Sequence, residues 1–130
     1  GDPRPIRDFI YIEDEINAYI NAVLTDKNIA GEVFIPGTGR TISIRDLVEK
    51  IKDMIGYKGD IEWNSTSYRP CEIWKIEVNP SKIKNVLGWE AKYSLEEGLG
   101  KTIEFWRNKI TARTMDIDMG KTPKGVSEEL

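Results

Sequence analysis

The chain has 130 residues, with 19 Lys and Arg against 22 Asp and Glu, no histidine and one cysteine. The lack of histidine excludes Ser-His and Cys-His catalysis and histidine-ligated metals, and one cysteine excludes an internal disulfide and a multi-cysteine zinc site. The net charge of −3 argues against a nucleic-acid partner bound through a basic field. No apolar run approaches ~18 residues and no charged-then-apolar leader opens the chain. We therefore expect neither a membrane span nor a signal peptide, and a cytoplasmic location.

Residues 1–7 contain two prolines and have the character of a loop. Apolar residues then recur at helical spacing, which predicts a helix from Glu13 to Leu24 with three acidic residues in its first turn, where the helix dipole favours negative charge. A short strand is expected at Glu32–Ile35, and the turn Pro36–Gly39 closes it. Both glycines of this turn are expected to adopt positive φ.

Ser43 has the features of a helix N-cap, because its hydroxyl can accept the free amide of Asp46. The helix that follows carries an apolar stripe and is expected to stop at Gly56, a residue suited to a left-handed C-cap. Two more short strands are predicted, at Ile61–Trp63 and Trp74–Val78, on either side of an irregular polar segment.

A short helix is predicted within Asn79–Val86, with the stop at Gly88. Ser94 and Glu97 have the spacing of a capping box. This predicts the start of a last helix, whose apolar positions continue to Ile110. Beyond it, glycine, lysine, threonine and proline dominate residues 111–130. We expect this end of the chain to form an extended tail.

These elements predict an α/β fold, namely a small mixed domain with few short strands and about four helices. The gaps between the strands are too short for a complete Rossmann sheet. One domain is expected over residues 1–110, followed by the C-terminal tail over 111–130. The turn Gly37-Thr38-Gly39 lacks a third glycine at the spacing of a dinucleotide fingerprint and does not open a helix directly, so no cofactor is expected to bind this chain.

Five motifs stand in the order found in one enzyme family. They are Arg7–Asp14 (RDFIYIED), Glu32–Ser43 (EVFIPGTGRTIS), Arg69–Glu72 (RPCE), Leu87–Trp89 (LGW) and Ser94–Leu99 (SLEEGL). In these motifs the chain resembles the C-terminal half of extended short-chain dehydrogenases/reductases, the NAD(P)-dependent nucleotide-sugar epimerases and dehydratases. The third motif ends in glutamate, and in this respect it resembles the same loop in the GDP-mannose 4,6-dehydratase branch of the family.

The resemblance also shows what the chain lacks. The N-terminal half of this family is a Rossmann domain with a glycine-rich motif and a catalytic Tyr-x-x-x-Lys pair, whereas no tyrosine here has a lysine four residues later. The resemblance therefore implies no catalytic, cofactor-binding or metal-binding residue in this chain, and assigns NAD or NADP to the missing Rossmann domain. We expect the parent protein to be an enzyme and the purified chain alone to show no turnover.

Arg7, Arg69 and Glu72 are the candidate substrate-binding residues. The resemblance places both arginines against the diphosphate of a nucleotide-diphosphate sugar and the glutamate beside the ribose diol. Planar guanidinium groups bind phosphate oxygens in pairs, and a carboxylate accepts hydrogen bonds from both hydroxyls of a diol. From spacing alone, surface charges are the better explanation of both arginines, with Arg7 paired to Asp8 or Asp14; the resemblance favours the substrate-binding role.

A second function stays open, that of a stand-alone nucleotide-binding or protein-docking module which has lost the dehydrogenase half. A Rossmann motif in frame before Gly1 would favour the first hypothesis, and a start codon there the second. A domain separated from its neighbour exposes an apolar face. We expect parts of the Phe9–Ile12 and Trp74 regions on that face, and self-association through it.

Overall fold

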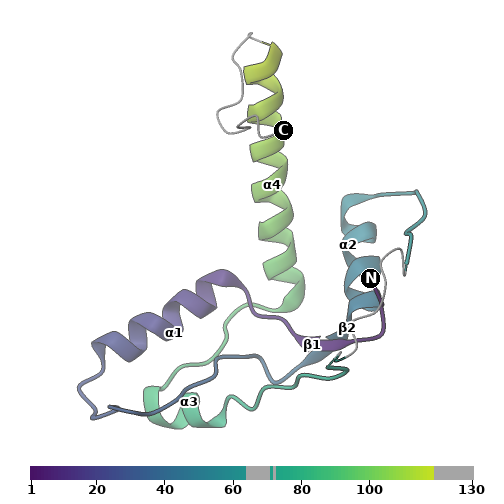
Figure 1. The fold of residues 1–130 in the computed structure, drawn as a ribbon. Helices are drawn as coiled ribbons and strands as arrows, with labels where there is room; N and C mark the ends of the chain where they lie inside the picture. The colour runs from purple at the N-terminus through teal and green to yellow at the C-terminus, as the bar shows by residue number, and fades with distance from the viewer. Residues whose placement is uncertain (64–70, 72, 119–130) are drawn as a thin grey trace, which may run out of the picture. The chain divides into compact units, whose positions relative to one another are not determined.

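The computed structural model describes residues 1–63, 71 and 73–118, the side chains of 112–118 excepted (Figure 1). Its elements in chain order are β1 (Ile6–Asp8), α1 (Ile12–Leu24), β2 (Thr41–Ser43), α2 (Ile44–Ile55), α3 (Ser81–Leu87) and α4 (Leu95–Asp118). The chain divides into two units, 1–99 and 100–130, and each is described by itself. The predicted α/β class, a small mixed domain with about four helices, is confirmed, and the sheet in the described residues has two strands.

The sheet in the described residues is a small antiparallel pair of β1 and β2, in which Arg7 lies opposite Ile42. Sequence analysis predicted neither strand, because three residues are too few to display an alternating pattern. Of the predicted edge strand Trp74–Val78, only a parallel bridge between Lys75 and Ile6 forms. The Ile6 amide donates to the Trp74 carbonyl (2.8 Å) and the Ile76 amide to the Ile6 carbonyl (3.0 Å).

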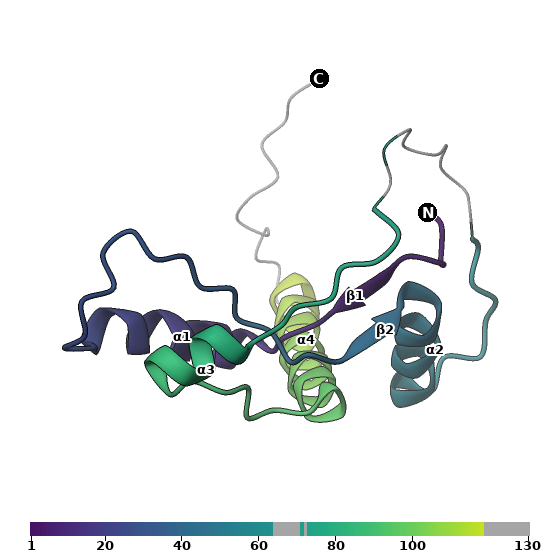
Figure 2. The same ribbon diagram turned by 90° about the horizontal axis from the view of Figure 1, so that it is seen from below.

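The strands predicted at Glu32–Ile35 and Ile61–Trp63 do not pair with any strand in the part of the chain described. Apolar sequence predicts where side chains are buried, whereas a strand also requires a partner backbone. Figure 2 shows the segment between α1 and β2, which contains the first of these stretches, running beside α1 and α3. Phe34 from this segment packs against the core that the two helices share.

Both ends of α2 are capped as predicted. The Ser43 hydroxyl accepts the Asp46 amide (3.0 Å) and donates to its carboxylate (2.6 Å). The first two amides of the helix, those of Ile44 and Arg45, donate to the carbonyls of Pro5 (2.9 Å) and Pro3 (2.8 Å), which binds the opening segment to α2. At the other end Gly56 adopts φ 72°. The amides of Gly56 and Tyr57 donate hydrogen bonds to the carbonyls of Asp53 and Lys52, which completes a Schellman motif.

The small core lies between α1, α3 and the segment that joins α3 to α4. Its buried hydrophobic residues are Ala18, Ile83 and Trp89. Asp14, in the first turn of α1, is only 1% exposed. Its carboxylate accepts the amides of Lys92 and Tyr93, both at 3.0 Å, and its carbonyl accepts the Trp89 indole at 3.0 Å. One aspartate therefore joins α1 to the segment before α4.

The capping box at the start of α4 is confirmed: the Ser94 amide donates to the Glu97 carboxylate at 2.8 Å and the Glu97 amide to the Ser94 hydroxyl at 3.2 Å. The predicted helix end at Ile110 is wrong, since α4 continues to Asp118. Residues 111–118 contain neither glycine nor proline, so nothing in the backbone stops the helix there.

The domain limits 1–110 and 111–130 stay a prediction. Among the described residues, no helix has the length and apolarity needed to cross a membrane.

The glycine turn differs in detail from its prediction. Gly39 has the expected positive φ of 71°, whereas Gly37 does not have a positive φ. Gly37 is required for a different reason, because a Cβ atom there would lie 2.6 Å from both Cβ and Cγ1 of Val78. This close approach holds the turn against the segment that precedes α3.

Replacing Gly37 with alanine should therefore lower the free energy of unfolding by about 1–3 kcal/mol, through overpacking against Val78. Denaturant unfolding of the purified chain measures the change. The double variant Gly37→Ala/Val78→Gly removes both obstructing atoms and should recover part of the loss relative to Val78→Gly alone. Equal losses in the two backgrounds would contradict this explanation.

Candidate functional site

The Asp8 carboxylate fixes the glycine turn beside β1. It accepts hydrogen bonds from the Thr38 hydroxyl (2.6 Å), the Thr38 amide (3.1 Å) and the Gly39 amide (2.8 Å). The Thr38 hydroxyl oxygen in turn accepts the Arg40 amide at 3.0 Å. Three donors on one carboxylate give the turn a defined position at the end of the sheet, where it forms one wall of a cavity.

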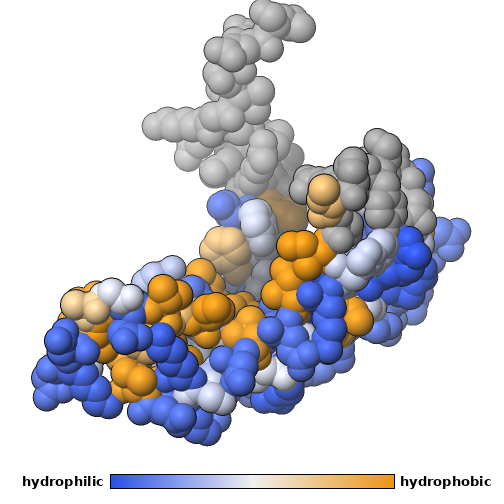
Figure 3. Space-filling model, turned by 60° about the horizontal axis from the view of Figure 1, so that its bottom comes forward, coloured by the Kyte–Doolittle hydropathy of each residue, from blue (hydrophilic) through white to orange (hydrophobic). Residues whose placement is uncertain are grey.

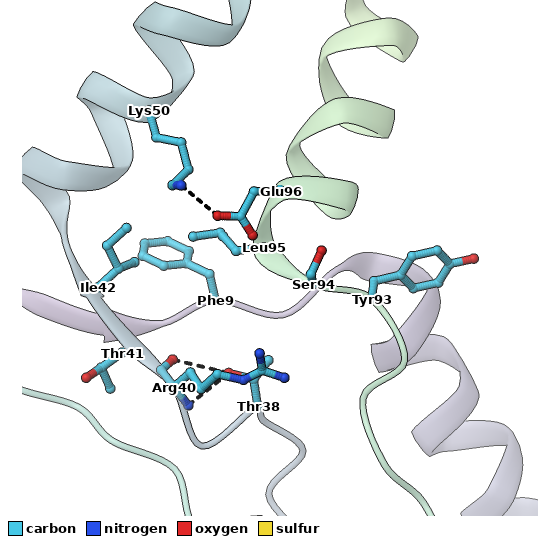
Figure 4. A pocket seen from close by; sticks show the side chains of 10 residues that line it. All are labelled: Phe9, Thr38, Arg40, Thr41, Ile42, Lys50, Tyr93, Ser94, Leu95 and Glu96. Atoms are coloured by element: carbon cyan, nitrogen blue, oxygen red, sulfur yellow. Dashed lines mark hydrogen bonds and ion pairs between the residues drawn. The ribbon is translucent and has the colours of Figure 1, made fainter.

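This cavity, of about 330 Å³, lies within the unit 1–99 (Figure 4). It is lined by residues from the end of β1, the glycine turn, β2, α2 and the start of α4, namely Phe9, Thr38, Arg40, Thr41, Ile42, Lys50, Tyr93, Ser94, Leu95 and Glu96. The Lys50 ammonium and the Glu96 carboxylate form an ion pair of 2.6 Å across it. This hydrogen bond from Lys50 is the main cause that lowers the pKa of Glu96 below its ordinary value.

Arg7 lies in β1 rather than in the loop predicted for residues 1–7. Side chains directly opposite each other in an antiparallel pair share one face of the sheet, and Ile42, opposite Arg7, lines the cavity. Arg7 therefore lies on the same face of the sheet as Ile42, but it does not itself line the cavity. It is half-buried, and its Nη1 donates to the Ile6 carbonyl at 2.8 Å. Arg69 and Glu72 lie outside the described residues, and their roles stay predictions.

The charged residues of the cavity were missed by sequence analysis. Arg40 directly follows the glycine turn, Lys50 lies in α2 and Glu96 in α4, and no single motif contains all three. Glu96 belongs to the SLEEGL motif, but its sequence signal there is that of a first-turn acid, which favours the helix dipole. Only the folded chain brings these three charges to one cavity.

Tyr93 connects the start of α4 to the first turn of α1. Its ring meets that of Tyr11 edge-on, with 4.8 Å between the centroids, and its hydroxyl donates to the Glu13 carboxylate at 2.5 Å. This hydrogen bond, followed by desolvation and repulsion from nearby negative charge, raises the pKa of Tyr93 to about 12. The hydroxyl is therefore held as a donor, not as a base.

Titration of the phenolate absorbance should show a component with a midpoint near pH 12 that belongs to Tyr93. Because the pKa is raised in the folded chain, the stability that this proton confers is present below about pH 10 and is lost as pH rises through the folded pKa. Tyr93→Phe should remove the component, and Glu13→Gln should shift it towards the ordinary value of 10.0. A Glu13→Gln titration identical to that of the parent chain would contradict the assigned cause.

Comparisons with known proteins cover most of the chain. Residues 1–102 match the family model described as GDP-mannose 4,6 dehydratase. Putative GDP-L-fucose synthase 2 of Arabidopsis thaliana is 29% identical over 113 residues, which are 87% of this chain and 33% of that protein. The crystal structure of a UDP-glucose 4-epimerase from Thermotoga maritima with UDP-glucose has a TM-score of 0.75 and 34% identity, and the match covers 85% of this chain and 34% of that one.

A dTDP-glucose 4,6-dehydratase from Bacillus anthracis, solved in complex with NAD, has a TM-score of 0.71 and 28% identity, over 85% of this chain and 34% of that one. The chain thus spans about a third of the length of the relatives that it matches. The resemblance to nucleotide-sugar epimerases and dehydratases is confirmed, as is the partial coverage of their fold. Because the family model matches most of its residues, the chain belongs to the GDP-mannose 4,6 dehydratase family.

Proposed function

We propose that this chain is the substrate-binding part of a longer NAD(P)-dependent nucleotide-sugar epimerase or dehydratase. The observation that carries the proposal is the match over 85% of the chain to one third of an epimerase solved with UDP-glucose. The pairing of Arg7 with Ile42, a residue that lines the cavity, supports it. The substrate class is a nucleotide-diphosphate sugar, and the other partner is the part of the enzyme that this chain does not span.

Arg7 and Arg69 are the proposed diphosphate clamp, with Glu72 on the ribose. Guanidinium groups suit a diphosphate because their planar fork donates two parallel hydrogen bonds to phosphate oxygens. The contribution of this chain is to bind and orient the nucleotide sugar, and positioning of this kind lowers the entropic part of a reaction barrier.

The residues present do not fit a cradle for the pyrophosphate of NAD or NADP. In the glycine turn, the amides of Thr38 and Gly39 already donate to the Asp8 carboxylate. A negative side chain thus occupies the position that a phosphate would take, and Asp8 would repel one. NAD or NADP is therefore assigned to the remaining two thirds of the enzyme, and no step of the reaction is assigned to residues of this chain.

An NMR titration of the ¹⁵N-labelled chain with UDP-glucose and with GDP-mannose tests the proposal. At millimolar ligand, the amide signals of Arg7, Phe9 and Ile42 should shift, because NMR detects complexes with dissociation constants in this range. Arg7→Ala should abolish the shifts, whereas Arg107→Ala, which removes an exposed arginine of α4, should leave them unchanged. Shifts that are absent, or that persist unchanged in Arg7→Ala, would overturn the role given to Arg7.

A further inference from the structure

Two tryptophans stand on either side of the segment 64–72, which contains two of the candidate substrate-binding residues. Trp63 directly precedes this segment and is half-buried, and Trp74 follows two residues after it. Each ring lies under an arginine. The guanidinium carbon of Arg45 is 5.1 Å from the ring centroid of Trp63, and that of Arg4 is 4.7 Å from the ring centroid of Trp74. Both distances are those of cation–π contacts, so an arginine contacts the chain on each side of the segment.

The two arginines are joined through the opening segment of the chain. Arg45, in the first turn of α2, donates its amide to the Pro3 carbonyl at 2.8 Å. Pro3 and Pro5 are buried, and Arg4 between them is exposed. The Arg4 guanidinium is held by Asp2, with Nε at 3.1 Å from both carboxylate oxygens and Nη2 at 2.8 Å from one of them. A guanidinium oriented by a carboxylate loses less freedom when it also stacks on a ring.

The chain after the segment is bound to the residue that directly precedes Arg7. The Ile6 amide donates to the Trp74 carbonyl and the Ile76 amide to the Ile6 carbonyl. Burial does not hold these residues in place. The surface of the chain carries apolar residues among hydrophilic ones (Figure 3), and Ile73, Trp74 and Ile76 are 59%, 45% and 42% exposed. The position of Trp74 therefore depends on the backbone bonds to Ile6 and on the stacked arginine.

Trp74 belongs to one of the two regions predicted for an exposed apolar face. In these regions Ile12 and Trp74 are exposed, whereas residues 9–11 are half-buried. The exposed ring of Trp74 makes a contact within the chain, with Arg4. Self-association through these regions stays a prediction.

Covalent geometry connects this anchor to Arg69, which lies outside the described residues. Arg69 stands five positions before Trp74 in the sequence. Since an extended chain spans at most about 3.6 Å per residue, the Cα atom of Arg69 lies within about 18 Å of that of Trp74, whatever the path between them. The carbonyl of Trp74 is bound to the residue next to Arg7. Fixing the chain on both sides of the segment therefore restricts the volume around Arg7 that Arg69 can occupy.

We propose that Arg4 and Arg45 are positioning residues for nucleotide-sugar binding, which keep Arg69 close to Arg7 by stacking on the tryptophans on either side of its segment. Neither residue is assigned a contact with the substrate. A contact that the free protein already makes removes part of the freedom that the ligand would otherwise have to restrict, and so improves affinity. The proposal rests on the proposed function, because it requires Arg69 and Arg7 to bind one diphosphate.

Hydrogen exchange of the Ile6 and Ile76 amides in the purified chain tests the anchor at Trp74. Arg4→Ala should speed the exchange of both amides about two- to fivefold, the factor that corresponds to a cation–π contact at an exposed site. Arg4→Lys keeps a cation over the ring and should recover part of the protection. Lys109→Ala removes an equivalent contact to two aromatic rings of α4 and should leave both rates unchanged. Unchanged exchange in Arg4→Ala would overturn the proposal.

Isothermal titration calorimetry of the longer protein with UDP-glucose and with GDP-mannose tests the positioning itself. Arg4→Ala should weaken binding about two- to fivefold, Arg4→Lys should recover part of the loss, and Arg45→Ala should behave as Arg4→Ala does. Because both act through Arg69, neither substitution to alanine should cause a further loss in an Arg69→Ala background, whereas the loss should persist in an Arg7→Ala background.

A contact that only stabilises the fold would give the same loss in both backgrounds. Equal losses in the Arg69→Ala and Arg7→Ala proteins, or unchanged binding in Arg4→Ala, would therefore overturn the positioning role while the proposed function stands. Unchanged binding in Arg7→Ala alone would overturn the proposed function, and this proposal with it. The two failures are thus distinguished by the same measurement.

Discussion

Replacing Arg7 with alanine in the longer protein is expected to weaken nucleotide-sugar binding by about tenfold or more. A hydrogen bond between charged groups contributes about 1.5–3 kcal/mol, and a factor of ten in affinity corresponds to about 1.4 kcal/mol. Arg69→Ala should have an effect of the same size if the two guanidinium groups bind one diphosphate. Isothermal titration calorimetry with UDP-glucose and GDP-mannose measures both.

Two controls distinguish a clamp from a general loss of positive charge. Arg7→Lys keeps the charge but not the planar fork, so it should recover only part of the lost affinity. NAD(P) affinity of the longer protein should stay nearly unchanged in every variant, because that site is assigned to the other part of the enzyme. Full recovery by lysine, or an equal loss of NAD(P) affinity, would contradict the clamp.

Replacing Asp14 with alanine should lower the free energy of unfolding by about 2–5 kcal/mol. The substitution leaves the amides of Lys92 and Tyr93 without the carboxylate that accepts them, and an unsatisfied buried donor costs about 1–3 kcal/mol. Because the buried core of the unit 1–99 is small, a loss of this size is a large fraction of its stability.

Denaturant unfolding monitored by tryptophan fluorescence measures the effect, since Trp89 donates to the same aspartate. Asp14→Asn offers one acceptor oxygen and a competing donor, so it should recover only part of the stability. The matched control Asp26→Asn removes an exposed charge beyond the end of α1 and should change the free energy of unfolding by less than about 0.5 kcal/mol. A similar small change in Asp14→Ala would show that the two amides find other partners.

Features decided by a few neighbouring residues could be predicted from the sequence. The caps at Ser43, Gly56 and Ser94 depend on hydrogen bonds within a turn of the chain, and the structure has all three. The strands could not be predicted in the same way. β1 and β2 pair across residues that are more than thirty positions apart, and Val33–Ile35 has a strand-like sequence without a partner in the described residues.

The same distinction applies to the site: a residue within a contiguous motif could be predicted, whereas residues brought together by folding could not. Arg7 could be singled out because it belongs to a contiguous motif, and the register of β1 places it opposite Ile42, which lines the cavity. The cavity itself could not be predicted, since Lys50 and Glu96 approach each other only after α2 and the start of α4 have folded. Arg69 and Glu72, outside the described residues, still rest on the motif alone.

The bond between the Trp89 indole and the Asp14 carbonyl spans 75 positions of the chain. Such a contact cannot form on the ribosome until both ends have been synthesised. At about 5–20 residues per second, the interval between Asp14 and Trp89 lasts roughly 4–15 s. During that time α1 exists without the tryptophan and the two amides that later hold its first turn, and the residues that it buries in the fold, Asp14 and Ala18, face solvent with its exposed apolar residues. A nascent helix of this kind is a natural substrate for a chaperone that binds apolar segments, so synthesis without one should increase aggregation of the chain.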